Sequence, residues 1–180
     1  IKQFQDFTMK KAFFSGLFIV CLYLLQSTLF AMFSIGGIRP NLLIIATASL
    51  GFLGGKRTGI YAGFFSGLLI DIAFRPIYGV NALLYMYIGY ICGLFKKVVF
   101  SGDIKLPLLF IAGSDFVYNM AFYFFYFFFR GRFEISYYFM KIILPEMVYT
   151  TIMACIIYPL IHFVMKRIEL PEKKGEQTIV

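Results

Sequence analysis

Two aspartates lie inside long apolar segments of this chain, and they are its clearest candidates for chemistry. Asp71 comes near the end of the segment 59–74 (GIYAGFFSGLLIDIAF), and Asp115 lies within the segment 106–129. Carboxylates are rare in membrane-spanning segments, where they face a bundle interior or a cavity and serve ion paths, proton relays or helix contacts. Asn119 follows Asp115 by one helical turn and would share its face. Each aspartate could serve an ion or substrate path, but we favour hydrogen bonding between helices. Asp115 is the better candidate for chemistry.

Asp71 continues a regular series of glycines. Gly59, Gly63 and Gly67 recur every four residues, and Asp71 occupies the next position. Each step of four residues turns a helix by about 400°, so all four residues share one broad face. Small residues at this spacing let helix backbones approach closely in a membrane. The segment is therefore predicted to be a helix packed inside the protein.

A local partner for Asp71 follows one turn later. Arg75 is four residues on, near the outer surface, and Pro76 makes continuation of the helix unfavourable. We interpret Asp71 as a structural clamp between the helix end and the next turn, in preference to a proton relay.

The other polar residues within apolar segments are explained by structure. Gln26 and Asn81 suit hydrogen bonds between helices. Glu146 follows Pro145 and is predicted to cap the start of the last helix. His162 is the only histidine, and no further metal ligands accompany it. We expect no metal and no cofactor. Because motifs of hydrolases, phosphate loops and metalloproteases are missing, we expect no enzyme.

The composition is that of a membrane protein. Of 180 residues, 61% are hydrophobic and only 14% are charged, and the apolar residues fall into segments of membrane-spanning size. We predict an all-α polytopic domain over 1–165 and a flexible cytoplasmic tail over 166–180. The domain is predicted to have six transmembrane helices, at about 12–33, 41–54, 59–74, 79–95, 106–129 and 142–165.

The second and third of these segments are short. Their lengths as helices are about 21 and 24 Å, against a hydrocarbon core of about 30 Å. A re-entrant hairpin would place Lys56 and Arg57 deep in the bilayer at a cost of several kcal/mol. Six spans is therefore the better interpretation.

The basic residues predict the orientation. The net charge of +8 comes from 17 Lys and Arg, which lie mainly in tails and loops. With both termini in the cytoplasm, twelve of them fall on the inner side, as the positive-inside rule favours. We therefore expect the charge to reflect membrane orientation, and no nucleic acid as a partner.

A run of eight aromatic residues, 122–129, ends the fifth segment. It is typical of an aromatic belt at the membrane interface, but eight in a row exceeds what anchoring requires. Biased composition explains it too, since phenylalanine is abundant throughout. A docking face for another transmembrane helix is the alternative.

Three motifs between Arg39 and Gly93 occur in a recognisable order. They are the stretch RPNLL from Arg39, the stretch GFFSGLLIDI around Asp71, and the stretch GVNALLYMYIGYICG from Gly79. In order and spacing they resemble the rod shape-determining protein MreD family of bacterial cell-wall elongation.

The resemblance implies a non-enzymatic scaffold in the bacterial inner membrane. Such proteins bind MreC and act with MreB, RodA and a class B penicillin-binding transpeptidase, and their fold resembles the substrate-binding subunits of energy-coupling-factor transporters. We expect the glycine-faced helix to pack against its neighbours and leave an outer-leaflet surface for the transmembrane helix of MreC. The residues expected to support packing or interaction are Gly59, Gly63, Gly67, Asp71, Arg75, Gly79, Asn81, Gly89, Gly93, Asp115 and Asn119.

Two other functions stay open. A substrate-binding subunit of a vitamin transporter would need a polar pocket open to the outside, where Asp71, Asn81 and Glu146 could converge. A small proton-coupled transporter would use Asp115 and Asp71, but the internal symmetry expected of many such carriers is missing.

Overall fold

A computed structural model describes residues 2–32, 34, 37–74, 79–99, 105–126 and 135–176. These residues are helical, with short connections and no β-strand. The elements are α1 (Lys2–Met32), α2 (Leu42–Gly54), α3 (Lys56–Phe74), α4 (Val80–Leu94), α5 (Lys96–Val99), α6 (Lys105–Tyr126), α7 (Ile135–Tyr138), the π-helix η2 (Phe139–Ile143) and α8 (Leu144–Glu176). The prediction of an all-helical protein is confirmed for this part of the chain.

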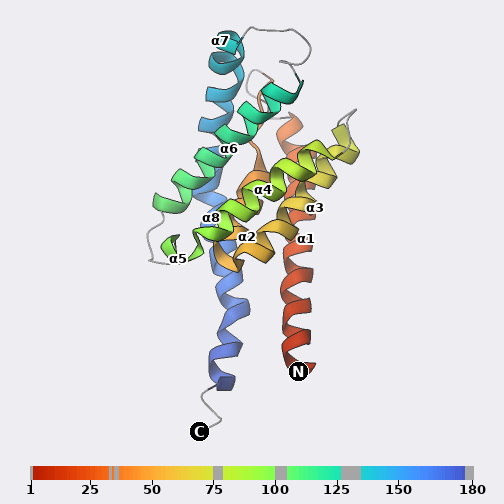
Figure 1. Ribbon diagram of the computed structural model, residues 1–180, viewed down its shortest axis with the longest axis vertical. Helices are drawn as coiled ribbons and strands as arrows, with labels where there is room; N and C mark the ends of the chain where they lie inside the picture. Colours follow the sequence, from red (N-terminus) through yellow and green to blue (C-terminus); the bar gives the residue numbers. More distant parts are fainter. Residues whose placement is uncertain are drawn as a thin grey trace.

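The two longest helices set the long axis of the molecule. α1 begins and α8 ends at the same end, while α7 lies at the opposite end (Figure 1). α4 and α6 run obliquely to this axis. The most extensive contact between helices joins α3 and α4.

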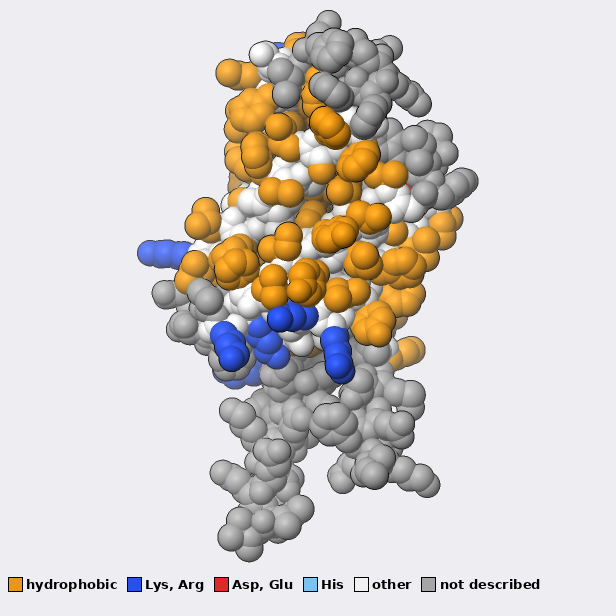
Figure 2. Space-filling view, viewed as in Figure 1, with side chains coloured by type: hydrophobic (Ala, Val, Ile, Leu, Met, Phe, Trp, Pro, Cys, Tyr) orange, Lys and Arg blue, Asp and Glu red, His pale blue; other side chains and the backbone are white. Residues whose placement is uncertain are grey.

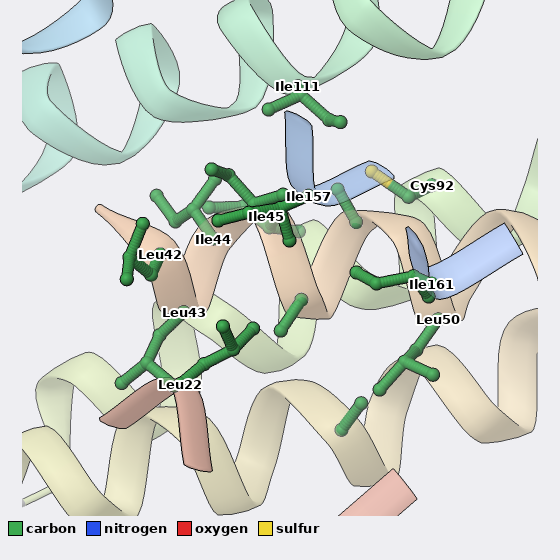
Figure 3. Packing of buried hydrophobic residues seen from close by; sticks show 14 of the residues in the cluster. Leu22, Leu42, Leu43, Ile44, Ile45, Leu50, Cys92, Ile111, Ile157 and Ile161 are labelled. Carbon is green, nitrogen blue, oxygen red and sulfur yellow. The ribbon is translucent and has the colours of Figure 1, made fainter. Parts of the chain in front are cut away.

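The centre of the bundle is α2. Twelve of its thirteen residues, Leu42 to Leu53, are buried, and it packs against α1, α3, α4, α6 and α8. A helix that is apolar on all sides is stable only when protein or lipid surrounds it. Figure 3 shows Leu42, Ile45 and Leu50 among apolar side chains of the surrounding helices.

The surrounding helices carry large apolar side chains on their outer faces. Phe64 and Phe65 on α3, Tyr87 on α4 and Leu109 on α6 are exposed, and Figure 2 shows such side chains spread over the face in view. Exposure of this extent on a soluble protein would promote aggregation, whereas a bilayer solvates it. The outer surface is therefore suited to lipid.

Two described helical stretches are long and apolar enough to cross a membrane, at 105–125 and 136–167. Shorter apolar helices lie at 13–28, 42–54 and 80–94. Each of the six expected segments overlaps a helix, but six membrane spans stay a prediction. The end of the expected fifth span, 127–129, lies outside the described residues.

The last helix differs most from expectation. The chain is helical without interruption from Ile135 to Glu176, so helix extends well before the expected start at 142 and into the segment expected as a tail. Pro145 has no N–H to donate, and the five-residue π-turn ends two residues before it, at Ile143. Glu146 lies in the first turn of α8, as predicted, but helical residues from Ile135 to Ile143 precede it, so no free helix end is described there for Glu146 to cap.

Candidate functional site

The three glycines of α3 form the surface on which α4 packs. A methyl group on Gly59 would collide with the carbonyl oxygen of Gly89, and one on Gly63 would collide with that of Tyr85. At Gly67 it would collide with the backbone of Asn81 and Ala82. Backbone atoms cannot rotate away as side chains do, so these positions exclude any larger residue. The face predicted from the glycine spacing is therefore the face that meets α4.

Glycines of α4 and α2 complete this close approach. A methyl group on Gly89 would collide with the carbonyl oxygen of Gly59, and one on Gly93 would lie 2.6 Å from the Cα atom of Lys56. The Cβ position of Gly51 on α2 lies 2.9 Å from the carbonyl oxygen of Gly89. Three helix backbones thus approach one another where these glycines lie, which gives α2, α3 and α4 a rigid common core.

The carboxylate of Asp71 binds the first turn of α4. Its Oδ2 accepts hydrogen bonds from the backbone N–H of Gly79 at 3.0 Å and of Ala82 at 2.9 Å. Its Oδ1 accepts from the backbone N–H of Asn81 at 3.3 Å and from the side-chain Nδ2 of Asn81 at 2.8 Å. Asp71 is fully buried. Four donors around one carboxylate offset much of its desolvation cost.

Asp71 caps α4 from a different helix, α3. A capping side chain normally comes from the residue just before the helix that it caps. The N-cap of α4 is Gly79, which has no side chain for the free amide groups and adopts a φ of 99°. This left-handed conformation favours glycine. A carboxylate from α3 satisfies these amides and places a negative charge at the positive end of the α4 dipole. The predicted partner Arg75 lies outside the described residues, so the described clamp joins Asp71 to α4.

Hydrogen bonds extend from this clamp to the neighbouring helices. Asn81 accepts a hydrogen bond through Oδ1 from the hydroxyl of Tyr118 on α6, at 2.9 Å. The rings of Tyr118 and Tyr85 pack edge to face with centroids 5.0 Å apart, and the Tyr85 hydroxyl donates to Oδ1 of Asn41 at 2.7 Å. Buried hydroxyl and amide groups in this arrangement fix the relative positions of α3, α4 and α6.

The same contacts satisfy the first turn of α2. Asn41 caps this helix, since its Oδ1 accepts from the N–H of Ile44 at 3.3 Å, and its own N–H donates to Oγ1 of Thr150 on α8 at 3.0 Å. Gln26 on α1 accepts from the N–H of Leu43 at 3.2 Å. We call the residues that link the helices in this way the polar network: Gln26, Asn41, Asp71, Asn81, Tyr85, Tyr118 and Thr150.

Asp115 lies beside this network, next to its member Thr150. Its side chain is fully buried, and neither carboxylate oxygen has a hydrogen-bond partner among the described residues. Glu146 and Thr150 on α8 both lie close to this carboxyl group. Asn119, predicted to share its face, is also buried but donates to the backbone oxygen of Asp115 at 3.1 Å. The carboxyl group of Asp115 thus has fewer hydrogen bonds to the described residues than that of Asp71.

The remaining candidates are not brought together. His162 is exposed and lies near the ring of Tyr158, with centroids 6.2 Å apart. In the aromatic run, Phe122 and Tyr123 are buried, while Phe124 and Phe125 are exposed. The described residues contain no group of three or more His, Cys, Asp or Glu side chains suited to a metal ion.

Sequence reasoning missed several members of the polar network. Tyr85 and Tyr118 were hidden among many aromatic residues, and a threonine inside an apolar helix carries no distinctive signal. Asn41 had one available signal, because an asparagine directly before an apolar helical run is a frequent N-cap. The arrangement as a whole can hold six helices in fixed positions.

Comparison with protein families gives one result. A profile of the family described as rod shape-determining protein MreD matches residues 8–168. Searches of curated proteins and of solved structures found no significant match. The family match confirms the resemblance drawn from the motifs between Arg39 and Gly93, and with the two long apolar helices it identifies a membrane protein with a role in rod shape. The chain belongs to the MreD family of rod shape-determining proteins.

Proposed function

We propose that this protein is a non-enzymatic membrane scaffold of the bacterial cell-wall elongation machinery. It binds the single transmembrane helix of MreC and so helps to position the peptidoglycan synthases, RodA and a class B penicillin-binding transpeptidase, relative to MreB. The observation that carries the proposal is the rigid unit of α3 and α4, held by backbone contacts at Gly59 and Gly63 and by the Asp71 clamp. A rigid surface suits a scaffold, because binding then costs little conformational entropy.

The outward face of this unit is apolar and aromatic. Its exposed large side chains are Tyr61, Phe64, Phe65, Ile72, Leu83, Tyr87, Tyr90, Ile91 and Leu94. Association of helices in a membrane is driven by side-chain packing, since lipid is as apolar as the helices themselves. Large side chains on a fixed backbone form a surface of defined shape, against which a partner helix can pack.

The topology we propose is a multi-pass protein of the inner membrane with both termini in the cytoplasm. α1 begins and α8 ends at the same end of the molecule (Figure 1), which supports an even number of crossings. Basic residues at two helix junctions, among them Lys56 and Lys97, are exposed. Under the positive-inside rule these connections favour the cytoplasmic side.

Co-purification with tagged MreC tests the scaffold. We expect the double variant Phe64→Ala/Tyr87→Ala to lose most of the bound MreC, because it removes large side chains from α3 and α4. The matched control is Ile156→Ala/Phe163→Ala on α8, where both side chains are also exposed, and it should retain MreC. Equal retention by both double variants would exclude the α3–α4 face as the docking surface. Depletion of the protein should round the cells, a primary defect that neither transporter function predicts.

One observation favours a second function, that of a substrate-binding subunit of a vitamin transporter. The fully buried Asp115, without hydrogen bonds among the described residues, is the kind of polar group that a small ligand inside the bundle would engage. Binding of a radiolabelled vitamin to the purified protein, together with co-purification of an ATPase module, would support the transporter. Stable MreC binding without either result would support the scaffold.

A further inference from the structure

Four basic residues lie at two helix junctions of this protein. Lys56 and Arg57 open α3 directly after the turn at Gly55, and Lys96 and Lys97 open α5 directly after α4. Lys56, Arg57 and Lys97 are exposed, and Lys96 is half-buried. We call these four side chains the basic patch.

The close packing of α3 and α4 brings the two junctions together. The Cβ position of Gly93 lies 2.6 Å from Cα of Lys56, and that of Gly55 lies 3.4 Å from Cδ of Lys96. Gly55 is buried and has a φ of 87°, so a larger residue would strain the turn. The fold thus gathers four positive charges from segments forty residues apart.

These charges are not balanced by the described part of the protein. Only Asp71, Asp115 and Glu146 have carboxylates among the described side chains. Asp71 is at the opposite end of α3, and Asp115 and Glu146 lie on α6 and α8. Asp103 lies outside the described residues. Like charges held together repel one another, so an anion bound at the patch would stabilise it.

Apolar side chains continue directly from the patch. Ile91, Leu94 and Phe95 precede Lys96 in the chain and are exposed. Figure 2 shows Lys and Arg side chains gathered at the lower limit of the apolar surface. A matching ligand therefore has a negatively charged head and long apolar chains. An acidic protein segment would match the charges but would leave the adjoining apolar side chains uncovered.

We propose that the basic patch binds the phosphate headgroup of an anionic phospholipid, whose acyl chains lie along the outer face of α3 and α4. Arg57 presents the planar fork that suits phosphate oxygens, and the three lysines act as mobile point charges around it. The headgroup site depends on the two helix junctions and not on MreC, whereas the acyl chains lie on the same outer face of α3 and α4 that is proposed to bind MreC.

The test is lipid titration of the purified full-length protein in a neutral detergent. Phosphatidylglycerol and phosphatidylcholine with the same acyl chains are added separately, and bound lipid is counted by native mass spectrometry. We expect selective retention of phosphatidylglycerol, weakened by salt. Loss of one basic residue near a membrane surface lowers affinity about fivefold, so Lys56→Gln/Arg57→Gln should lower it about 25-fold.

Matched variants separate the patch from general charge effects. Lys141→Gln removes an exposed lysine in η2, far along the chain from the patch, and should leave phosphatidylglycerol binding unchanged. Lys96→Gln/Lys97→Gln provides a second patch variant if the first does not fold. Thermal unfolding without added lipid confirms that the compared variants are folded.

Three outcomes would overturn the proposal. In the first, folded patch variants retain phosphatidylglycerol as well as the natural protein. In the second, inorganic phosphate displaces the lipid at equal concentration, which would indicate a site for free anions. In the third, polyglutamate binds in a patch-dependent way while phosphatidylglycerol does not, which would indicate an acidic protein partner.

Discussion

The pair α3 and α4 and the pair α6 and α8 each carry a glycine and a buried aspartate, but in opposite circumstances. In the first, Gly63 has no room for a methyl group and Asp71 accepts four hydrogen bonds. In the second, Gly113 faces open space and Asp115 has no hydrogen-bond partner among the described residues. Both aspartates are equally buried. Residue type and burial are therefore the same for Asp71 and Asp115. The two aspartates differ in their hydrogen bonds.

The pair α3 and α4 and the pair α6 and α8 also differ in how closely their helices are held together. The backbones of α3 and α4 lie in direct contact and share a clamped end, so this unit moves as one body. α6 packs against α8, and the π-helix η2 lies directly before α8. π-Turns occur frequently at functional sites. Adjustment of the bundle around a ligand or a partner is therefore expected at α6 and α8.

The largest contrast is expected when leucine replaces each glycine. Gly63→Leu forces a side chain into the backbone of α4 and should cost about 3 kcal/mol or more, with little folded protein recovered. Gly113→Leu on α6 should be neutral or stabilising by up to about 1 kcal/mol, because glycine is a poor helix former. Thermal unfolding in detergent measures both variants. Similar stabilities would show that the glycine face is not a close contact, and normal rod shape with Gly63→Leu would argue against the scaffold.

Asparagine at position 71 should have the next largest effect. Asp71→Asn keeps the shape but removes the charge and places an amino group against N–H donors of α4. We expect a loss of about 1 to 3 kcal/mol in the free energy of unfolding, with faster hydrogen exchange at Asn81 and Ala82. Protein levels and MreC binding should fall together. Normal values of both would count against the clamp.

The smallest effect on stability is expected at position 115. Asp115→Asn replaces a buried carboxyl group with an amide of the same shape and removes no described hydrogen bond, so the unfolding free energy should change by less than about 1 kcal/mol. The unfolding free energies of Asp115→Asn and Asp71→Asn are measured under the same detergent conditions and compared. A loss equal to that of Asp71→Asn would show that the two carboxylates have the same role. Loss of rod shape at unchanged stability would give Asp115 a function.

Much of the fold could be predicted from local patterns. Apolar segments longer than ten residues predicted helices at each position where a long helix is described. The four-residue spacing of Gly59, Gly63 and Gly67 predicted one packed face, because helical periodicity is a local property. The end of the last segment could not be predicted in this way. Pro145 suggested a helix start, but a π-turn allows the helix to continue through it.

The candidate site was predicted only in part. Asp71 was expected to clamp a helix end, yet Arg75 was the only partner visible within one helical turn. The described donors are eight to eleven residues away, on the next helix. Tyr118 and Thr150 are farther still, and their hydroxyl groups are indistinguishable in sequence from those of other buried residues. Hydrogen bonds between helices depend on how the connecting segments place one helix against another. The periodicity of residues within a helix gives no information about that placement.

The sequence by itself determined the membrane character of this protein, its helices, its packed glycine face and, through motif order, its membership of the MreD family. Only the tertiary structure decided that this face meets α4, that Asp71 caps α4 from outside, and that Asp115 is buried beside α8 with fewer described hydrogen bonds than Asp71. The physical reason is the range of the forces involved. Apolar length and residue spacing act within one helix, whereas the satisfaction of a buried carboxylate depends on donors that the fold brings from other segments.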